Sequence, residues 1–468
     1  MRLCVAVGGL DSARSAAAAY TLHTLLDTLG LAHDILPEAA AAAPPGRVAL
    51  TYGRPVAADA LVEIPPGEPT TADEAVRVHR RAMADRETLF AGDGARVRVE
   101  ADIVGAAAFW LTGGDEARPD RDAFSRLRGA GGPLPVPAVT DLMHVLGAAL
   151  ERAAGAAGLA LERQPAWPAG HRFAVLLSHD VDLWRRRTAR RLARDLARSL
   201  VAPRRLPAVA RAFCGGPDPW SDLDAIADLE QARGMHSTFF VLAGRPDRRL
   251  HGKRIVNSYD APADAVRDTL RRLVARGCEV ALHGSFDSFA IAEQLAAERR
   301  DLEALCDEPV RGCRQHFLRF HWPDTWRAQA AAGLRYDATL GYHDADGYRA
   351  GFSFPFRPIL GPEPPAGSRP AGGLLELPLA VSDGAFSDYG RLDASAAWER
   401  LRAHLERTEA DGSMLGVLWH NTHFCDLDAP GYRGVYERAL DWIRDHGGWG
   451  ASAIEIAEWW KRRLGGDG

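Results

Sequence analysis

The sequence lacks the features of a zinc knuckle, a disulfide scaffold, a membrane span or a nucleic-acid-binding protein. Its six cysteines include no CxxC pair, which excludes a zinc knuckle and a thioredoxin-type motif. No run of about 18 apolar residues occurs, so no membrane span is predicted. The formal net charge of -5 gives no chain-wide basic field, so we do not expect nucleic acid as a partner.

The amino terminus also lacks the long apolar core of a secretory signal peptide, because its first apolar run stops at Asp11. We therefore expect a cytoplasmic protein. What the chain does have is length and a globular composition: 468 residues, 47% hydrophobic and 25% charged. A chain of this length is expected to form roughly two or three domains.

The first third of the chain mixes short strand-like runs with helical patterns. The runs are LCVAV, RVALTYG and ALVEI, and the Ala-rich segments around them have apolar residues at helical spacing. Residues 102–116 are predicted to be a packed helix and turn. The segment LERQPAWPAGHRF, with two prolines and a glycine, is typical of a linker. We predict an amino-terminal accessory α/β domain over residues 1–165 and a second domain over residues 166–468.

From residue 173 onward, continuous apolar runs alternate with helical patterns. The runs are FAVLLS, STFFVL, EVALHG, LLELPLA and GVLWH, and each suits a strand that is buried on both faces. Strand and helix alternation predicts parallel strands with crossover helices, in a barrel or an open sheet. In both folds the functional residues gather at the carboxyl ends of the strands.

Polar residues follow several of these runs. Asp180 and Asp182 follow the first run and share one face of an extended segment, so one could hold a cation while the other accepts protons; they could equally form a helix cap or an Asx turn. His283 and Asp287 would share a helix face at i and i+4 and could ligate zinc. On that motif alone, a cap and a hydrogen-bonded loop histidine are favoured.

Two further clusters are basic or imidazole-rich. In RGCRQHFLRFHWP, an arginine could keep a catalytic carboxylate ionised, or could form a structural ion pair. In VLWHNTHF, His420 and His423 follow an apolar run, which favours a site over a structural role. Several strand ends thus deliver His, Asp or Arg to what would be one rim.

Taken together, these motifs resemble the polysaccharide deacetylase family, also called the NodB homology domain or carbohydrate esterase family 4. The resemblance covers roughly residues 173–460 and rests on SHDVD, LHGS, RQHF, YDATLGY with GYRAG, and WHNTHF. It implies a deformed (β/α) barrel of NodB type, preceded here by the smaller α/β accessory domain.

The resemblance also implies roles for single residues. Asp180 would be the general base, oriented by Arg314, and His420 the general acid, for which we predict Asp337 as the carboxylate partner. Asp182 and His283 would be metal ligands. The family has a second histidine where this chain has Asp287, so either Asp287 or His316 would be the third ligand. The predicted substrate-binding residues are Arg319, His423 and Arg349.

The implied activity is metal-dependent hydrolysis of an acyl group, N-acetyl above all, on an amino sugar or glycan precursor, with a divalent metal, Zn²⁺, as cofactor. Two alternatives share the motifs: a small-molecule C–N amidohydrolase on the same fold, and a catalytically degenerate carbohydrate-binding module. An HD-type phosphohydrolase is discounted, because its His-Asp pair lies on helices whereas His179 and Asp180 follow a strand-like run.

Residues 185–205 are rich in arginine, with Asp195 as their only acid. They could be a solvated helical insertion, or a patch that makes weak contact with an anionic substrate or membrane surface. An aromatic set could stack on sugar rings or belong to the core: Trp322, Trp326, Tyr342 and Phe352.

Overall fold

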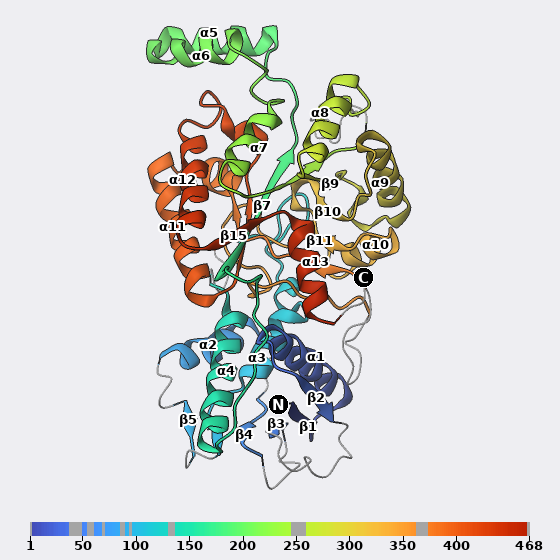
Figure 1. Cartoon of the computed structure of the whole chain (residues 1–468), viewed down its shortest axis with the longest axis vertical. Coiled ribbons are helices and arrows are strands. Elements are labelled where there is room, and N and C mark those ends of the chain that lie inside the picture. Colours follow the sequence, from blue (N-terminus) through green and yellow to red (C-terminus); the bar gives the residue numbers. More distant parts are fainter. Residues whose placement is uncertain are drawn as a thin grey trace.

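Two β-sheets lie one above the other along the long axis of the molecule in the computed structural model (Figure 1). The structure describes residues 2–36, 49–53, 60–67, 71–84, 89–92, 96–129, 136–244, 259–361 and 373–465. Among these, no helix has the length and apolar character needed to span a bilayer. We call the part that contains the first sheet the amino-terminal module and the part that contains the second sheet the barrel module.

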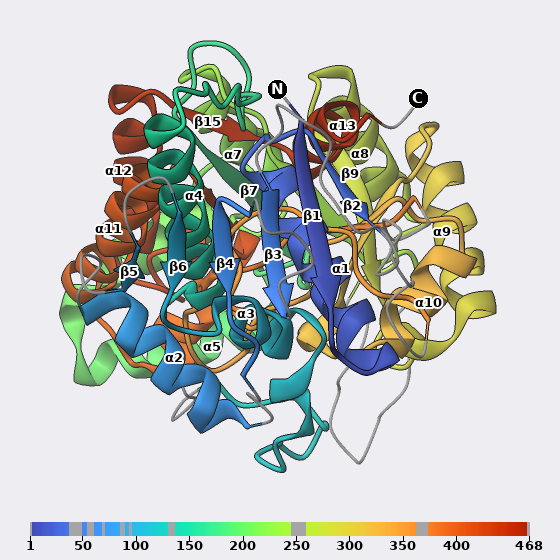
Figure 2. The same cartoon turned by 90° about the horizontal axis from the view of Figure 1, so that it is seen from below.

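The amino-terminal module is a six-stranded sheet in the order β2-β1-β3-β4-β6-β5, with only the β5–β6 pair antiparallel. The expected runs LCVAV, RVALTYG and ALVEI contain β1, β3 and β4. The helices lie between this sheet and the barrel module, as the view from below shows (Figure 2). The strands are β1 Leu3–Gly8, β2 His33–Leu36, β3 Ala49–Gly53, β4 Val62–Ile64, β5 Phe90–Ala91 and β6 Val97–Val99; the helices are α1 Ser12–Thr28, α2 Ala72–Ala84, α3 Ile103–Leu111 and α4 Ala138–Ala156.

The helix and turn predicted for residues 102–116 are confirmed. The Asp102 carboxylate accepts a hydrogen bond from the Gly105 backbone N–H at 2.7 Å and caps α3. The helix is followed by a short 3₁₀ turn, η1 Gly114–Ala117.

The barrel module is a nine-stranded, wholly parallel sheet in the order β12-β11-β10-β9-β8-β7-β14-β13, with β15 paired to β7. Its curled sheet and outer helices confirm the predicted deformed (β/α) barrel of NodB type. The run LLELPLA gives only one very short strand, β12, and the equally short β13 begins directly after it. The strands are β7 Phe173–Val181, β8 Thr238–Val241, β9 Glu279–Gly284, β10 Gly312–Gln315, β11 Tyr336–Asp337, β12 Leu375–Glu376, β13 Val381–Ser382, β14 Met414–Leu418 and β15 Gly448–Ala451.

Strand β7 is held on both edges along its length. On one edge it pairs with β14. On the other, β15 pairs with residues 173–176 and β8 with residues 178–181. All nine residues are buried, as a strand covered on both faces requires. The carboxyl end of β7 is therefore a firmly positioned place for side chains.

Most helices of the barrel module pack around the curled sheet, whereas α5 and α6 project from the end where β7 points (Figure 1). The helices are α5 Ala189–Val201, α6 Leu206–Cys214, α7 Leu223–Gln231, α8 Asp264–Ala275, α9 Ala292–Cys306, α10 Asp324–Ala331, α11 Ala394–Asp411, α12 Tyr432–Asp445 and α13 Ala453–Arg463.

The two modules share one continuous hydrophobic core, which extends from β1 to α13. Polar contacts also join them. The buried Arg349 guanidinium donates two hydrogen bonds to the Glu116 carboxylate, at 2.6 and 2.7 Å, and Thr140 Oγ1 lies 2.8 Å from Ser353 Oγ. The domain boundary between residues 165 and 166 stays a prediction, with one sheet on each side of it.

Candidate functional site

Three side chains from neighbouring strand ends converge at the carboxyl end of the barrel sheet. Asp182 follows β7, His283 lies near the end of β9, and His316 follows β10. Asp182 Oδ1 lies 3.2 Å from both His283 Nε2 and His316 Nδ1, and these two nitrogens are 2.9 Å apart. We call this set the metal cluster.

The metal cluster fits a divalent cation. One carboxylate and two imidazoles are zinc-type donors, and bonds of about 2.05 Å in a tetrahedral site place ligand atoms roughly 3.3 Å apart. His283 Nδ1–H donates to the Arg314 carbonyl oxygen at 2.9 Å, so its Nε2 carries the lone pair that faces the cluster. Burial alone would raise the pKa of Asp182, but His316 and His283 outweigh it and hold this pKa well below its usual value.

The proposed helical pairing of His283 with Asp287 is wrong. Strand β9 continues through His283 to Gly284, so the two residues do not share a helix face. Asp287 is 59% exposed and pairs with Arg319 at 3.1 Å. Of the two candidates for the third ligand, the structure places His316 in the metal cluster and Asp287 outside it.

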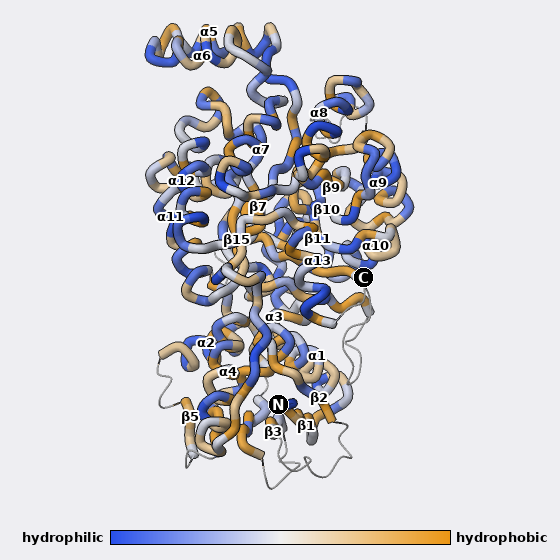
Figure 3. Tube along the Cα trace, viewed as in Figure 1, coloured by the Kyte–Doolittle hydropathy of each residue, from blue (hydrophilic) through white to orange (hydrophobic). Residues whose placement is uncertain are grey.

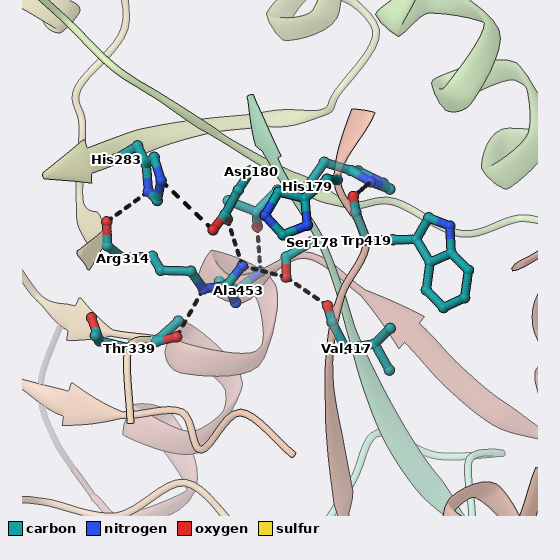
Figure 4. A network of polar contacts seen from close by, with 12 residues as sticks. Ser178, His179, Asp180, His283, Arg314, Thr339, Val417, Trp419 and Ala453 are labelled. Atoms are coloured by element: carbon teal, nitrogen blue, oxygen red, sulfur yellow. Dashed lines mark hydrogen bonds and ion pairs between the residues drawn. The ribbon is translucent and has the colours of Figure 1, made fainter. Parts of the chain in front are cut away.

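Asp180 lies beside the metal cluster and is held by an arginine (Figure 4). Arg314 Nη1 donates to Asp180 Oδ1 at 2.9 Å and to Ser178 Oγ at 2.8 Å, while its Nε donates to the Ala338 carbonyl oxygen at 2.9 Å. The guanidinium group has no exposure to solvent. A buried, fixed cation of this kind holds a carboxylate in place by a charge-assisted hydrogen bond. The other oxygen of Asp180 is 3.7 Å from His283 Nε2.

His420 reaches the metal cluster from the β14 side of the sheet. Its Nε2 is 3.7 Å from Asp182 Oδ2. Its Nδ1–H and its backbone N–H each donate to the Asp383 carboxylate at 2.6 Å. His423 Nδ1 lies 3.1 Å from the same carboxylate. Asp383 is therefore the buried anion between two imidazoles.

These contacts shift the pKa values of His420 and Asp383 in the directions that favour the charged form of each group. Burial would lower the pKa of His420, but Asp383 outweighs it and raises the pKa to about 10. Burial would raise the pKa of Asp383, but His420 and His423 hold it below its usual value. The pair is thus set to keep an imidazolium at neutral pH.

The expected pairing of His420 with Asp337 is wrong. Asp337 ends the two-residue strand β11 and is fully buried, where it accepts hydrogen bonds from Gln329 at 2.8 Å and from Thr339. Burial raises its pKa. The sequence carried a signal for the correct residue, because Asp383 also follows a strand, β13, at the same rim.

The three predicted substrate-binding residues are all engaged by other protein groups. Arg349 is buried against Glu116, so its guanidinium is unavailable and the prediction is wrong. His423 uses one ring nitrogen for Asp383 and lies 2.9 Å from Ser387 Oγ with the other, which corrects its role to support of Asp383. Arg319, which follows β10, holds the loop after β9 through Asp287 and the Phe286 carbonyl oxygen.

The aromatic set considered for stacking belongs largely to the core. Trp326, Tyr342 and Phe352 are buried, and the ring of the partly buried Trp322 packs on that of Trp326 at 4.3 Å. The indole of Trp322 also lies against Gly113 of the amino-terminal module. None of these four rings lies open on the surface.

A turn of the amino-terminal module packs beside the metal cluster, which the sequence did not indicate. The Phe124 ring lies 5.4 Å from Phe286 and 5.9 Å from Phe317, and Phe317 stacks edge-on against His316 at 4.2 Å. Arg126 Nη1 donates to the Phe317 carbonyl oxygen at 3.0 Å. Phe317 has a left-handed φ of 62°, a conformation that non-glycine residues keep only where surrounding contacts enforce it.

Comparisons with known proteins give structural neighbours only. No family model and no curated protein matches the chain. A provisionally assigned polysaccharide deacetylase from Mycobacterium smegmatis is 20% identical, with a TM-score of 0.43, over 64% of this chain and 96% of its own. Puue allantoinase is 17% identical, with a TM-score of 0.42, over 64% and 94%. The peptidoglycan deacetylase PdaC from Bacillus subtilis is 14% identical, with a TM-score of 0.33, over 63% and 95%.

The ligand assignment can be tested with two single variants. We expect His316→Ala to lower metal affinity by at least about 100-fold, since removing a ligand costs more than removing an outer hydrogen-bond partner. Asp287→Ala should retain the metal of the wild type, because Asp287 pairs with Arg319 instead. Metal content after dialysis, measured by mass spectrometry, checks both. Equal metal loss in the two variants would show that Asp287 is also a ligand.

Proposed function

We propose that the chain is a metal-dependent hydrolase that removes an acyl group, N-acetyl in the first instance, from an amino sugar or glycan precursor. One observation carries the proposal: an arginine-held carboxylate and a carboxylate-held imidazole each lie 3.7 Å from a different member of the metal cluster. A base and an acid on one metal site are the groups that amide hydrolysis needs. The motif resemblance to polysaccharide deacetylases points to the same reaction.

The three residues of the metal cluster would hold the cation. A divalent cation there, Zn²⁺ in our proposal, supplies polarisation of the acyl carbonyl and acidification of a water molecule. Asp180, held in place by Arg314, accepts the proton of the attacking water. His420, kept protonated by Asp383, donates a proton to the departing amine. The chain's own residues thus account for both proton transfers.

The rim beside the metal cluster suits a sugar ring. Phe317 is 36% exposed and Tyr389 is 51% exposed, and Arg126 joins them by donating to the Phe317 carbonyl oxygen at 3.0 Å and to Tyr389 Oη at 3.4 Å. Aromatic faces bind the apolar C–H surface of a ring through the hydrophobic effect. This exposed aromatic pair supports an acylated sugar as substrate.

Acetate release tests the proposal. The purified full chain, loaded with Zn²⁺, is incubated with N-acetylglucosamine oligosaccharides, and acetate is measured enzymatically. We expect turnover that is lost on chelation, restored by Zn²⁺, and absent in His283→Ala, since this variant removes a ligand. Arg300→Gln, an exposed change on α9, is the matched control.

Two other results would replace the proposal. A chain that holds metal but releases no acetate from any acetylated sugar, while cleaving a C–N bond in a small amide or ureide, would be a small-molecule amidohydrolase. A chain that takes up no metal even when Zn²⁺ is supplied would be a carbohydrate-binding module without catalysis.

A further inference from the structure

Helices α5 and α6 form a hairpin that projects from the molecule at the end opposite the amino-terminal module (Figure 1). Helix α5 follows β7 after only the short segment 182–188, which begins with Asp182, so the hairpin lies at the same end of the barrel as Asp182. We call residues 185–214 the arginine hairpin. Its sequence contains ten arginines and a single acid, Asp195.

The inner face of the arginine hairpin is fixed to the barrel module. The fully buried Arg186 pairs with Asp195 at 2.8 Å and with Asp428 at 2.7 Å. The Arg191 guanidinium lies over the Trp220 ring at 4.1 Å. Val209 of α6 belongs to a small apolar cluster with Trp220. The hairpin is thus anchored, and its one acid, Asp195, is already paired with Arg186.

The outer face of the arginine hairpin leaves large apolar side chains in solvent. Leu200 is 85% exposed and Val201 is 91% exposed, while Leu196 and Leu206 are 45% and 47% exposed. Leu196 and Leu200 are four residues apart, so they share one stripe of α5. Figure 3 shows hydrophobic and hydrophilic residues alternating along both helices. Exposed apolar side chains of this kind contribute favourable free energy only when another apolar surface or a lipid phase covers them.

Cationic side chains surround the apolar stripe. The exposed arginines of the hairpin are Arg185, Arg190, Arg194, Arg198, Arg204 and Arg211. A helix with an apolar stripe, a strongly cationic flank and low overall hydrophobicity is the type that lies in the plane of a membrane interface. Anionic headgroups attract the arginines while the apolar side chains enter the acyl boundary.

We propose that the arginine hairpin docks the protein on a lipid bilayer that contains anionic headgroups. Charge complementarity selects this occupant. A second copy of the same face would bring like charges together, and a nucleic acid or anionic glycan would leave Leu200 and Val201 uncovered. An anionic bilayer satisfies both the cationic and the apolar side chains. Docking in this way turns the end of the barrel that carries Asp182 toward the membrane.

Vesicle sedimentation tests the proposal on the full chain. The probes are vesicles of phosphatidylcholine alone and of phosphatidylcholine with phosphatidylglycerol. We expect the wild type to bind the anionic vesicles, with affinity that falls as salt rises. Arg194→Gln and Arg198→Gln should each weaken binding about fivefold, since one interfacial arginine contributes about 1 kcal/mol. Leu200→Ser and Val201→Ser should each weaken it by roughly tenfold or more.

A matched control variant has the same kinds of substitution elsewhere on the barrel module. The double variant Ile291→Ser with Arg300→Gln changes one exposed aliphatic residue just before α9 and one exposed arginine on α9, and should bind vesicles like the wild type. Unchanged thermal unfolding in every variant shows that the fold is intact, because all the changed side chains are exposed.

Three results would overturn the proposal. Absence of binding to anionic vesicles at low salt would remove it outright. Binding to heparin or DNA that depends on the arginines but not on Leu200 would make the hairpin a polyanion site instead. Concentration-dependent dimerisation that Leu200→Ser abolishes, without vesicle binding, would make the apolar stripe a protein interface.

Discussion

Asp180→Asn should lower kcat for deacetylation by about 10³-fold while the chain keeps its full metal content. General-base catalysis contributes about 10²–10⁴-fold, and asparagine has no group that accepts the proton. The amide oxygen can still accept the hydrogen bond from Arg314 Nη1, so the local geometry is retained. Acetate release and metal analysis on the same preparation check the two halves of this expectation.

The comparison with Asp182→Ala sharpens the result. Asp182 contacts both imidazoles of the metal cluster at 3.2 Å, so this variant should lose metal and activity together. If Asp180→Asn lost as much metal as Asp182→Ala, Asp180 would be a ligand and the base would have to be sought elsewhere.

Asp383→Asn should change the pH profile of hydrolysis. Asp383 raises the pKa of His420 to about 10, and the acid must be protonated to donate to the amine. Without the carboxylate the pKa falls toward its ordinary value near 6.5, so the alkaline limb of kcat moves to lower pH. We expect a loss of about 30-fold at pH 8, where a group with a pKa near 6.5 is mostly deprotonated, and a smaller loss at pH 6. A pH–rate series on both proteins measures this.

The direction of this shift does not depend on what else is bound near His420, because both proteins are measured under the same conditions. Asp388→Asn, an exposed acid five residues along the chain, is the control and should leave the profile unchanged. An Asp383→Asn profile that is lower at every pH by the same factor would mean that Asp383 orients His420 without tuning its charge.

The sequence predicted the barrel because its strands are buried on both faces and therefore read as continuous apolar runs. FAVLLS and EVALHG correspond to β7 and β9, and the polar residues after them lie at one rim as expected. The pairing of Asp180 with Arg314, predicted from the family motif, agrees with the 2.9 Å contact. The local hydrophobic pattern and the common direction of the strands are enough to predict the barrel and the rim at which the polar residues lie.

Other features depend on contacts that no local pattern contains. The predicted run EVALHG already contained His283, so a helical pairing with Asp287 required a helix to begin inside that run, whereas β9 extends to Gly284. LLELPLA reads as one strand, but only Leu375–Glu376 form one, and a separate short strand, β13, pairs with β14 and places Asp383 after it. Asp337 also lies at the end of a short strand, but its carboxylate accepts a hydrogen bond from Gln329, whereas that of Asp383 accepts one from His420. Only the three-dimensional pairing distinguishes them.

The contact between Glu116 and Arg349 has a consequence for how this protein could be divided or recombined. A barrel module made without the first 165 residues would leave the Arg349 guanidinium without the Glu116 carboxylate that pairs with it. It would also expose the face of the shared core on which α4 packs. The amino-terminal module is therefore not an appendage that evolution or an engineer could exchange freely: a different partner would have to supply both an anion and an apolar surface at the same places.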